Sequence, residues 1–193
     1  MRVVVNNSVT LDGVMQAPGR ADEDRRGDFK YGGWAVPYGD EVMGRVMAER
    51  MARSGSLLLG RRTYEDFASF WPRQSEDIPY SKAINSARKH VASTTLKAPL
   101  LWSNSILLEG DAVDAVSKLK KQTGNDIVIL GSGELIQSLM RNNLVDEYVL
   151  LIYPLVLGSG RRLFPEGGVP ATLRLINSVT TTTGVIIATY QPS

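Results

Sequence analysis

Two stretches of the sequence decide the fold, LLLGRRT at residues 57–63 and IVILGSGE at residues 127–134. Each begins as a short apolar run typical of a buried strand, passes through a glycine turn, and continues into a helical pattern. The free N–H groups of a helix N-terminus favour anions, and glycine lets a phosphate approach the backbone closely. Two such junctions together predict a site that holds a dinucleotide.

Each glycine turn, taken alone, is equally well explained by tight packing of a strand against a helix. The second junction also departs from the dinucleotide fingerprint of Rossmann folds, because Ile136 stands at the third glycine position. Arg61 and Arg62, which lie beside the first turn, favour the interpretation that this turn binds a phosphate. A guanidinium pair suits an additional phosphate, such as the 2′-phosphate that distinguishes NADP from NAD.

Outward from these junctions, apolar runs alternate with helical patterns, which predicts an α/β fold with a mainly parallel sheet in a single domain over residues 1–193. The last two strands flank a turn at residues 180–183 and should form an antiparallel hairpin. Helices are expected at Asp40–Arg53, Thr63–Phe70 with a Thr63-x-x-Asp66 capping box, Asp111–Lys121 and Glu134–Arg141. The expected strands are Arg2–Val5, Ser56–Leu59, His90–Ser93, Ser105–Leu108, Asp126–Leu130, Glu147–Tyr153, Leu173–Val179 and Gly184–Tyr190.

The amino-acid composition excludes several classes of function. The chain has 193 residues, 43% of them hydrophobic, and a net charge of +2, which is too small an excess for a nucleic-acid footprint. It has no cysteine and one histidine, so thiolate catalysis and Cys- or His-based metal sites are excluded. No apolar window is long enough to cross a membrane, and the first apolar run is too short for an export signal. We therefore expect a cytoplasmic protein without metal, nucleic-acid or membrane partners.

Residues 18–39 form a stretch of a different kind, with five glycines, two prolines and a run of mixed charge. It predicts a long loop, which is either a mobile lid over a site or a surface insertion.

The same residues carry a family resemblance. The motifs GRRTYE at residues 60–65, VAST at 91–94 and GSGE at 131–134 resemble, in order and spacing, the three cofactor motifs of the dihydrofolate reductase fold. The stretches SVTLDG at 8–13 and PLVLGSGRRLF at 154–164 look like the RibD C-terminal branch, the reductase of the riboflavin pathway. The likeness covers nearly the whole chain and implies a dihydrofolate reductase-like three-layer fold.

The resemblance implies NADPH as the cofactor. Arg61 would meet the 2′-phosphate, Ser93 and Thr94 would lie by the adenosine ribose, and the GSGE turn would hold the pyrophosphate. Taken without the resemblance, Ser93 and Thr94 are better explained as an ordinary strand end. The full set of implied cofactor-binding residues is Ser8, Met15, Gly60, Arg61, Arg62, Thr63, Ser93, Thr94, Gly131, Ser132, Gly133, Glu134 and Leu135.

The catalytic acid is less defined. In dihydrofolate reductase one acidic residue on the first helix grips the pterin, and Asp40 is the candidate here, although it also suits a helix N-terminus. Asp12 is a second candidate, or a turn residue. Trp34 would stack on a flat substrate or fill the core, and Arg161 would bind a substrate phosphate or lie in solvent.

These residues predict an NADPH-dependent reductase that transfers hydride to a C=N or C=O group of a small heterocyclic or ribosyl substrate. The nearest named activity is 5-amino-6-(5-phosphoribosylamino)uracil reduction in riboflavin biosynthesis. Dihydrofolate reduction is the enzymatic alternative, and a non-catalytic nucleotide-binding dimer is the other. Reductases of this branch are commonly dimers, so we expect a homodimer, with Val149–Tyr153 and the loop at residues 154–164 at its interface.

Overall fold

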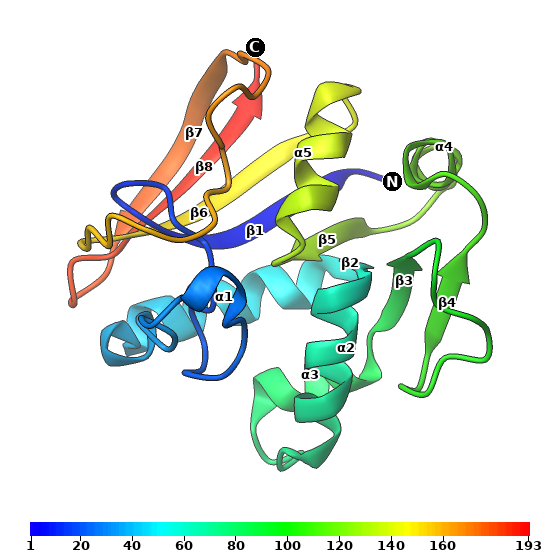
Figure 1. Cartoon of the computed structure of the whole chain (residues 1–193), viewed down its shortest axis with the longest axis horizontal. Coiled ribbons are helices and arrows are strands. Elements are labelled where there is room, and N and C mark those ends of the chain that lie inside the picture. The colour runs from blue at the N-terminus through cyan, green and yellow to red at the C-terminus, as the bar shows by residue number, and fades with distance from the viewer.

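The computed structural model describes residues 1–193 and contains one sheet of eight strands in the order β4-β3-β2-β5-β1-β6-β8-β7 (Figure 1). Neighbouring strands are parallel from β4 through β3, β2, β5 and β1 to β6. Strand β8 is antiparallel to β6, and β7 is antiparallel to β8. This confirms the predicted α/β fold and the C-terminal hairpin. The bounds are β1 Val3–Thr10, β2 Ser54–Gly60, β3 Arg88–Ala92, β4 Ser105–Leu108, β5 Asp126–Leu130, β6 Glu147–Tyr153, β7 Leu173–Thr180 and β8 Ile186–Pro192.

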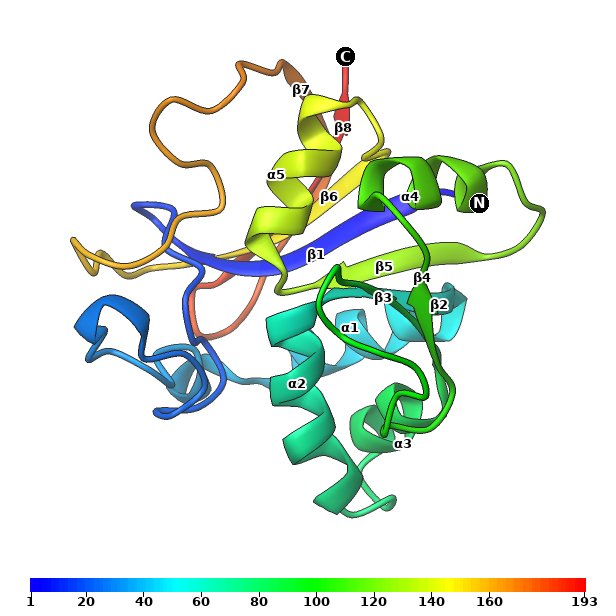
Figure 2. The same cartoon turned by 45° about the vertical axis from the view of Figure 1, so that its right-hand side comes forward.

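Helices cover both faces of the sheet and make three layers. Figure 2 shows α4 and α5 on one side of the sheet and α1, α2 and α3 on the other. The α-helices are α1 Glu41–Arg53, α2 Arg61–Phe70, α3 Pro79–Ser86, α4 Ala112–Lys120 and α5 Gly133–Arg141, and the short 3-10 helices are Arg26–Asp28, Val36–Tyr38 and Trp71–Arg73.

The central strands are apolar throughout because both of their faces are covered. In β2, Leu57 and Leu59 belong to the core beneath α1 and α3, whereas Leu58 belongs to the core beneath α4 and α5. Side chains alternate between the faces of a strand, so an uninterrupted leucine run supplies both cores. All three leucines are fully buried, and β2 ends at Gly60, directly before α2.

Three features of the fold differ from expectation. β1 continues through Asn6 and Asn7 to Thr10, because it pairs with β6 over that length. Helix α3 was not predicted; its Pro79 start and its two buried residues give only a weak helical signal. The predicted capping box of α2 is wrong, because the helix starts at Arg61 and its cap, Gly60, has no side chain to accept a bond.

The loop at residues 18–39 is packed against the body of the protein. The Gly33 and Ala35 amides donate to the Ala17 and Pro18 carbonyl oxygens at 2.8 and 3.0 Å, which closes the loop on itself. Arg20 pairs with Asp66 of α2, and Arg26 lies 3.6 Å from Glu134 of α5. Phe29 and Trp34 are buried. The loop is therefore an ordered wall on the side of α2 and α5.

Candidate functional site

A cavity of about 1550 Å³ opens at the carboxyl ends of β1, β2, β3 and β5, and it has two chemically different halves. Residues 60–63, 92–95, 110–112 and 130–135 line what we call the glycine-turn half. The helix half is lined by α1, by Asp66 and Phe67 of α2, and by residues 78–80 and 83. Ligands of parallel α/β sheets bind at this end of the strands, so the cavity is the candidate site.

The two predicted glycine turns lie side by side and are bonded to each other. The Gly60 amide donates to Ser132 Oγ at 3.0 Å, and the Ser132 amide donates to Thr63 Oγ1 at 3.0 Å. Thr63 therefore serves the neighbouring turn rather than a cap of its own helix. These bonds join the turn at residues 60–63 to the turn at residues 131–132, which is distant in the sequence.

Asn7 holds the second glycine turn in place through Gly131, and this role was not predicted from the sequence. It is buried within β1, one residue past the last pair that β1 makes with β5, and there its Oδ1 accepts from the Gly131 amide at 2.7 Å and its Nδ2 donates to the Gly131 carbonyl at 3.1 Å. An asparagine side chain offers both a donor and an acceptor, so it holds both polar groups of one residue. Gly131 has a φ of 57°, which glycine adopts without strain.

These bonds refine the predicted phosphate cradle. The amides of Gly60, Gly131 and Ser132 all have acceptors within the protein. The open donors are instead in the first turn of α5, where the Ser132 side chain makes no capping bond and the first N–H groups have no intrahelical partner. Residues 133–135 line the cavity and belong to this first turn.

The arginines predicted to meet phosphates stand at the cavity wall, each with a carboxylate. Arg61 contacts Glu65 at 2.9 Å, and Arg62 contacts Glu134 at 3.3 Å. Ser93 and Thr94 also line the cavity, after β3. The Ser93 hydroxyl accepts from the Thr95 and Leu96 amides, so it stabilises its own turn as well.

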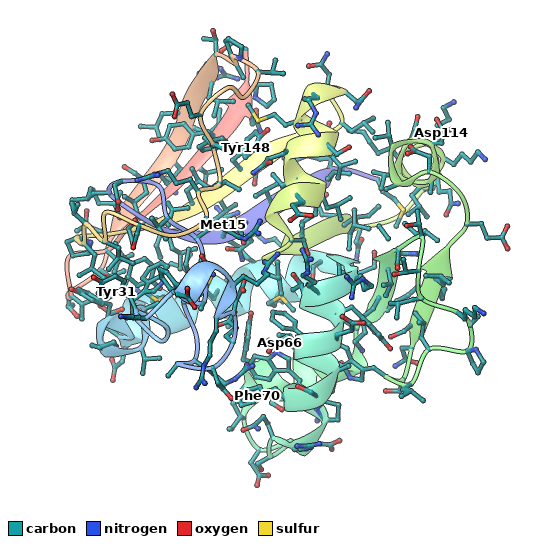
Figure 3. All side chains as sticks on the ribbon, in the orientation of Figure 1. Met15, Tyr31, Asp66, Phe70, Asp114 and Tyr148 are labelled. Carbon is teal, nitrogen blue, oxygen red and sulfur yellow. The ribbon has the colours of Figure 1, made fainter.

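Ser8 and Met15, the predicted nicotinamide neighbours, both line the cavity. Met15 lies beside the start of α5 (Figure 3), and its Sδ is only 2.7 Å from the place that a Cβ on Gly133 would occupy. The Ser8 hydroxyl donates to the Tyr153 hydroxyl at 3.5 Å. Burial raises the pKa of Tyr153, so its phenol is neutral at ordinary pH.

Asp40 lines the cavity, but its carboxylate is fully engaged in holding the fold. Oδ1 accepts from the Met43 amide at 2.8 Å as the cap of α1, and Oδ2 accepts from the Thr182 amide and hydroxyl at 2.6 Å. The Met43 amide bond, followed by those from Thr182, lowers the pKa of Asp40 to about 2. A carboxylate that stays ionised in this way is a poor proton donor, so the structure favours the helix-capping role of Asp40 over the catalytic one.

Asp12 and Trp34 do not line the cavity, so of the two roles expected for each the structure favours the turn residue for Asp12 and the core residue for Trp34. Asp12 accepts from the Thr10 hydroxyl and from the Leu157 and Gly158 amides, and the Thr10 bond lowers its pKa. It organises the packing of two loops. Trp34 is buried, donates to the Gln16 carbonyl at 2.7 Å and packs edge-on against Tyr153. It supports the cavity wall from behind.

Two carboxyl groups of the helix half were not anticipated, Glu23 in the loop at residues 18–39 and Asp66 on α2. Both line the cavity. Asp66 Oδ1 accepts from Arg20, whose guanidinium also lies 4.3 Å from the centre of the Phe70 ring, and Asp66 Oδ2 is buried without a partner. Figure 3 shows Asp66 and Phe70 one turn apart on α2.

The pKa values of both carboxyl groups are raised. Burial raises the pKa of Glu23, and the nearby charge of Asp66 adds to the shift. Burial also raises the pKa of Asp66, against the opposing effect of Arg20. Perturbed carboxyls in a cleft are candidates for acid chemistry. Sequence reasoning missed them because Asp66 matched a helix cap and Glu23 stood in a run of loop charges.

Three further observations bear on partners. Part of the expected dimer interface is wrong: Val149–Tyr153 lies in β6, an inner strand between β1 and β8, and its residues are mostly buried. The homodimer itself stays a prediction. No group of three or more His, Asp or Glu residues is placed to hold a metal ion. No helix is long and apolar enough to span a membrane.

Similar known proteins include an uncharacterized bacterial protein and a putative riboflavin biosynthesis protein. The chain is 28% identical over 193 residues to the uncharacterized protein YyaP of Bacillus subtilis, covering 98% of this chain and 94% of that protein. A putative riboflavin biosynthesis protein from Shewanella sp. PV-4 has a TM-score of 0.74 and 26% identity, covering 100% of this chain and 99% of that structure.

Two more distant structures share the fold. Dihydrofolate reductase from Enterococcus faecalis, solved with NADP(H), superposes with a TM-score of 0.62 at 13% identity, covering 100% of this chain and 96% of that one. Acinetobacter baumannii RibD superposes with a TM-score of 0.66 at 16% identity, and this chain covers 58% of it. Residues 1–187 match the family of the RibD C-terminal domain. The protein therefore belongs to the RibD C-terminal domain family, whose fold is that of dihydrofolate reductase.

Proposed function

We propose that the protein is an NADPH-dependent reductase that transfers hydride to a C=N or C=O carbon of a small heterocyclic or ribosyl substrate. The nearest named reaction is reduction of 5-amino-6-(5-phosphoribosylamino)uracil. Membership of the RibD C-terminal family and the likeness to a putative riboflavin biosynthesis protein support this choice.

The observation that carries the proposal is the two-part cavity. Its glycine-turn half has the open amides of the α5 first turn and the arginines of α2, which suit the phosphates of a dinucleotide. Its helix half is lined by Met43, Met47, Phe67 and other apolar side chains that suit a flat organic ring. A cofactor and a second reactant thus find separate places in one cavity.

The residues present fit NADPH. The α5 first turn would hold the pyrophosphate, Arg61 and Arg62 the 2′-phosphate, and Ser8 and Met15 the nicotinamide end. When bound, NADPH supplies the hydride. The protein orients the reactants and keeps water away, because reaction requires the two carbons to approach to roughly 3–3.5 Å.

The proton that accompanies the hydride needs a donor, and the Glu23–Asp66 pair is our candidate. These are the cavity carboxyls whose pKa values are raised, so they keep a proton to a higher pH than Asp40 does. A tuned carboxyl of this kind typically contributes a factor of about 10²–10⁴ to the rate.

Asp40 also bears on the alternative of dihydrofolate reduction. In that enzyme an acidic residue of the first helix grips the pterin, whereas both Asp40 oxygens here are taken by Met43 and by the β7–β8 turn. This favours a ribosylated pyrimidine over a pterin.

The test is to follow the loss of nicotinamide absorbance when NADPH is mixed with the enzyme and one acceptor at a time. The acceptors are the ribosylaminopyrimidine, dihydrofolate and simple carbonyl compounds. We expect turnover with the pyrimidine and none with dihydrofolate. NADPH binding without oxidation by any acceptor would contradict the proposal and favour a non-catalytic nucleotide-binding protein.

A further inference from the structure

Three arginines from three different segments converge on one oxygen of Glu134. The Glu134 Oε1 atom lies 3.2 Å from Arg161, 3.3 Å from Arg62 and 3.6 Å from Arg26. Arg26 belongs to the loop at residues 18–39, Arg62 to the start of α2, and Arg161 to the loop after β6. All four side chains line the cavity.

The carboxylate of Glu134 cannot neutralise the charge of all three arginines. Arg26 also pairs with Asp24, but Arg62 and Arg161 have no carboxylate partner other than Glu134. The cluster therefore holds three positive and two negative charges. In addition, Arg26 Nη1 is buried without a hydrogen-bond acceptor, since it lies too far from Glu134 for a bond. A group with several anionic oxygens would supply the missing acceptors.

The cluster also lies next to the open amides of α5, because Glu134 is itself in the first turn of that helix. Guanidinium groups and helix N-terminal amides both bind phosphate oxygens. The carboxylate of Glu134, in contrast, would repel an incoming phosphate.

We propose that Arg26, Arg62 and Arg161 form a clamp for a phosphate or pyrophosphate group, and that Glu134 is an internal anion that occupies the clamp until the ligand arrives. Glu134 then competes with the ligand instead of cradling it, which reverses the role expected from the sequence. The identification of the ligand as a dinucleotide or a ribosyl phosphate rests on the proposed function; the clamp itself does not.

The test is the affinity for inorganic pyrophosphate, measured by isothermal titration calorimetry at fixed ionic strength. Glu134→Gln should bind pyrophosphate about three- to tenfold more tightly than the unmodified protein, because two or three ion pairs no longer compete. Arg161→Gln should bind it more weakly by a similar factor. Glu76→Gln and Arg174→Gln make the same charge changes at exposed sites without ion pairs, and they should have little effect.

Unchanged or weaker pyrophosphate binding by Glu134→Gln would overturn the proposal, as would an equal gain in Glu76→Gln. The same titrations with NADPH and with ribose 5-phosphate separate the two sources of the phosphate. Tighter binding of NADPH alone assigns the clamp to the cofactor, and tighter binding of ribose 5-phosphate alone assigns it to the substrate. If pyrophosphate responds as expected but NADPH binds to no variant, the clamp stands and the proposed function fails.

Discussion

The two halves of the cavity are built in different ways. The glycine-turn half comes from short segments in which strand, turn and helix follow one another along the chain, as in residues 57–63 and 127–134. The helix half is assembled from α1, α2, α3 and the loop at residues 18–39, which meet only in the folded protein. Burial raises the pKa values of its carboxyls Glu23 and Asp66, whereas the glycine-turn half presents backbone amides and arginines.

The difference suggests a division of labour. Backbone amides and arginines recognise the constant part of a ligand, its phosphates, and they can do so from local motifs. The selection of a substrate and the storage of a proton need side chains from several elements. Variants in each half should therefore separate chemistry from cofactor binding.

The largest effect is expected in the helix half. Asp66→Asn should lower kcat about 100-fold, because it removes an acid, while the NADPH dissociation constant stays within about twofold. Steady-state kinetics with the pyrimidine substrate and a separate NADPH titration measure the two quantities.

Arg20→Gln is the matched control, since it breaks the same ion pair and leaves the carboxyl in place. A loss of kcat as large as that of Asp66→Asn would mean that the pair only positions the loop. A large change in NADPH affinity in Asp66→Asn would remove the separation between the halves.

The next largest effect is expected beneath the second glycine turn. Asn7→Ala leaves the Gly131 amide without its acceptor, which should cost about 1–3 kcal/mol in the free energy of unfolding. NADPH binding should weaken as well, because the turn loses its support. Denaturant unfolding and cofactor titration test both. Asn6→Ala is the control, since that amide contacts only Met47 Sδ at 3.5 Å; equal losses in both variants would contradict this role of Asn7.

The two halves of the cavity also differ in how well they could be predicted from the sequence. The glycine turns were predictable because three successive local signals, an apolar run, a glycine and a helical pattern, occur within eight residues. The hydrogen bonds that hold these turns were not predictable, because Asn7 and Gly131 are 124 residues apart in the sequence. Nearly every strand was placed for the same local reason.

The helix half could not be predicted in this way. Asp40 was a reasonable acid until the β7–β8 turn, which contains Thr182, brought donors to its second oxygen. Asp66 matched a capping pattern, although its partner is Arg20 in a loop 46 residues away. A carboxyl's protonation depends on burial and neighbours, and neither is a property of local sequence.

A smaller effect is expected from Asp40→Asn, and it should depend on pH. Because the pKa of Asp40 is about 2 in the folded protein, against 3.8 as its ordinary value, the ionised carboxylate stabilises the fold above about pH 4. That stabilisation is lost as the pH falls from about 4 to about 2. Thermal unfolding across this range should show a steeper decline for the unmodified protein than for Asp40→Asn.

Glu41→Gln changes the neighbouring carboxylate of the same helix start and serves as the control. Parallel pH profiles for Asp40→Asn and the unmodified protein would show that the capping bonds do not tune Asp40.

The smallest effect is expected at Gly133, where the start of α5 lies close to Met15. In Gly133→Ala the new Cβ displaces only the flexible Met15 sulfur, so the free energy of unfolding should change by no more than about 1 kcal/mol. NADPH should bind a few-fold more weakly, because Met15 lines the nicotinamide end. Unchanged NADPH affinity together with a displaced Met15 would exclude this residue from the cofactor site.

The most direct test of the central claim is the ratio of the NADH and NADPH dissociation constants, measured by nicotinamide fluorescence for the unmodified protein and for Arg61→Ala. We predict that NADPH binds at least about tenfold more tightly than NADH, since the 2′-phosphate makes charge-assisted bonds. We also predict that Arg61→Ala brings the ratio close to one. Equal binding of the two cofactors by the unmodified protein, or no binding of either, would contradict the claim that these glycine turns serve NADPH.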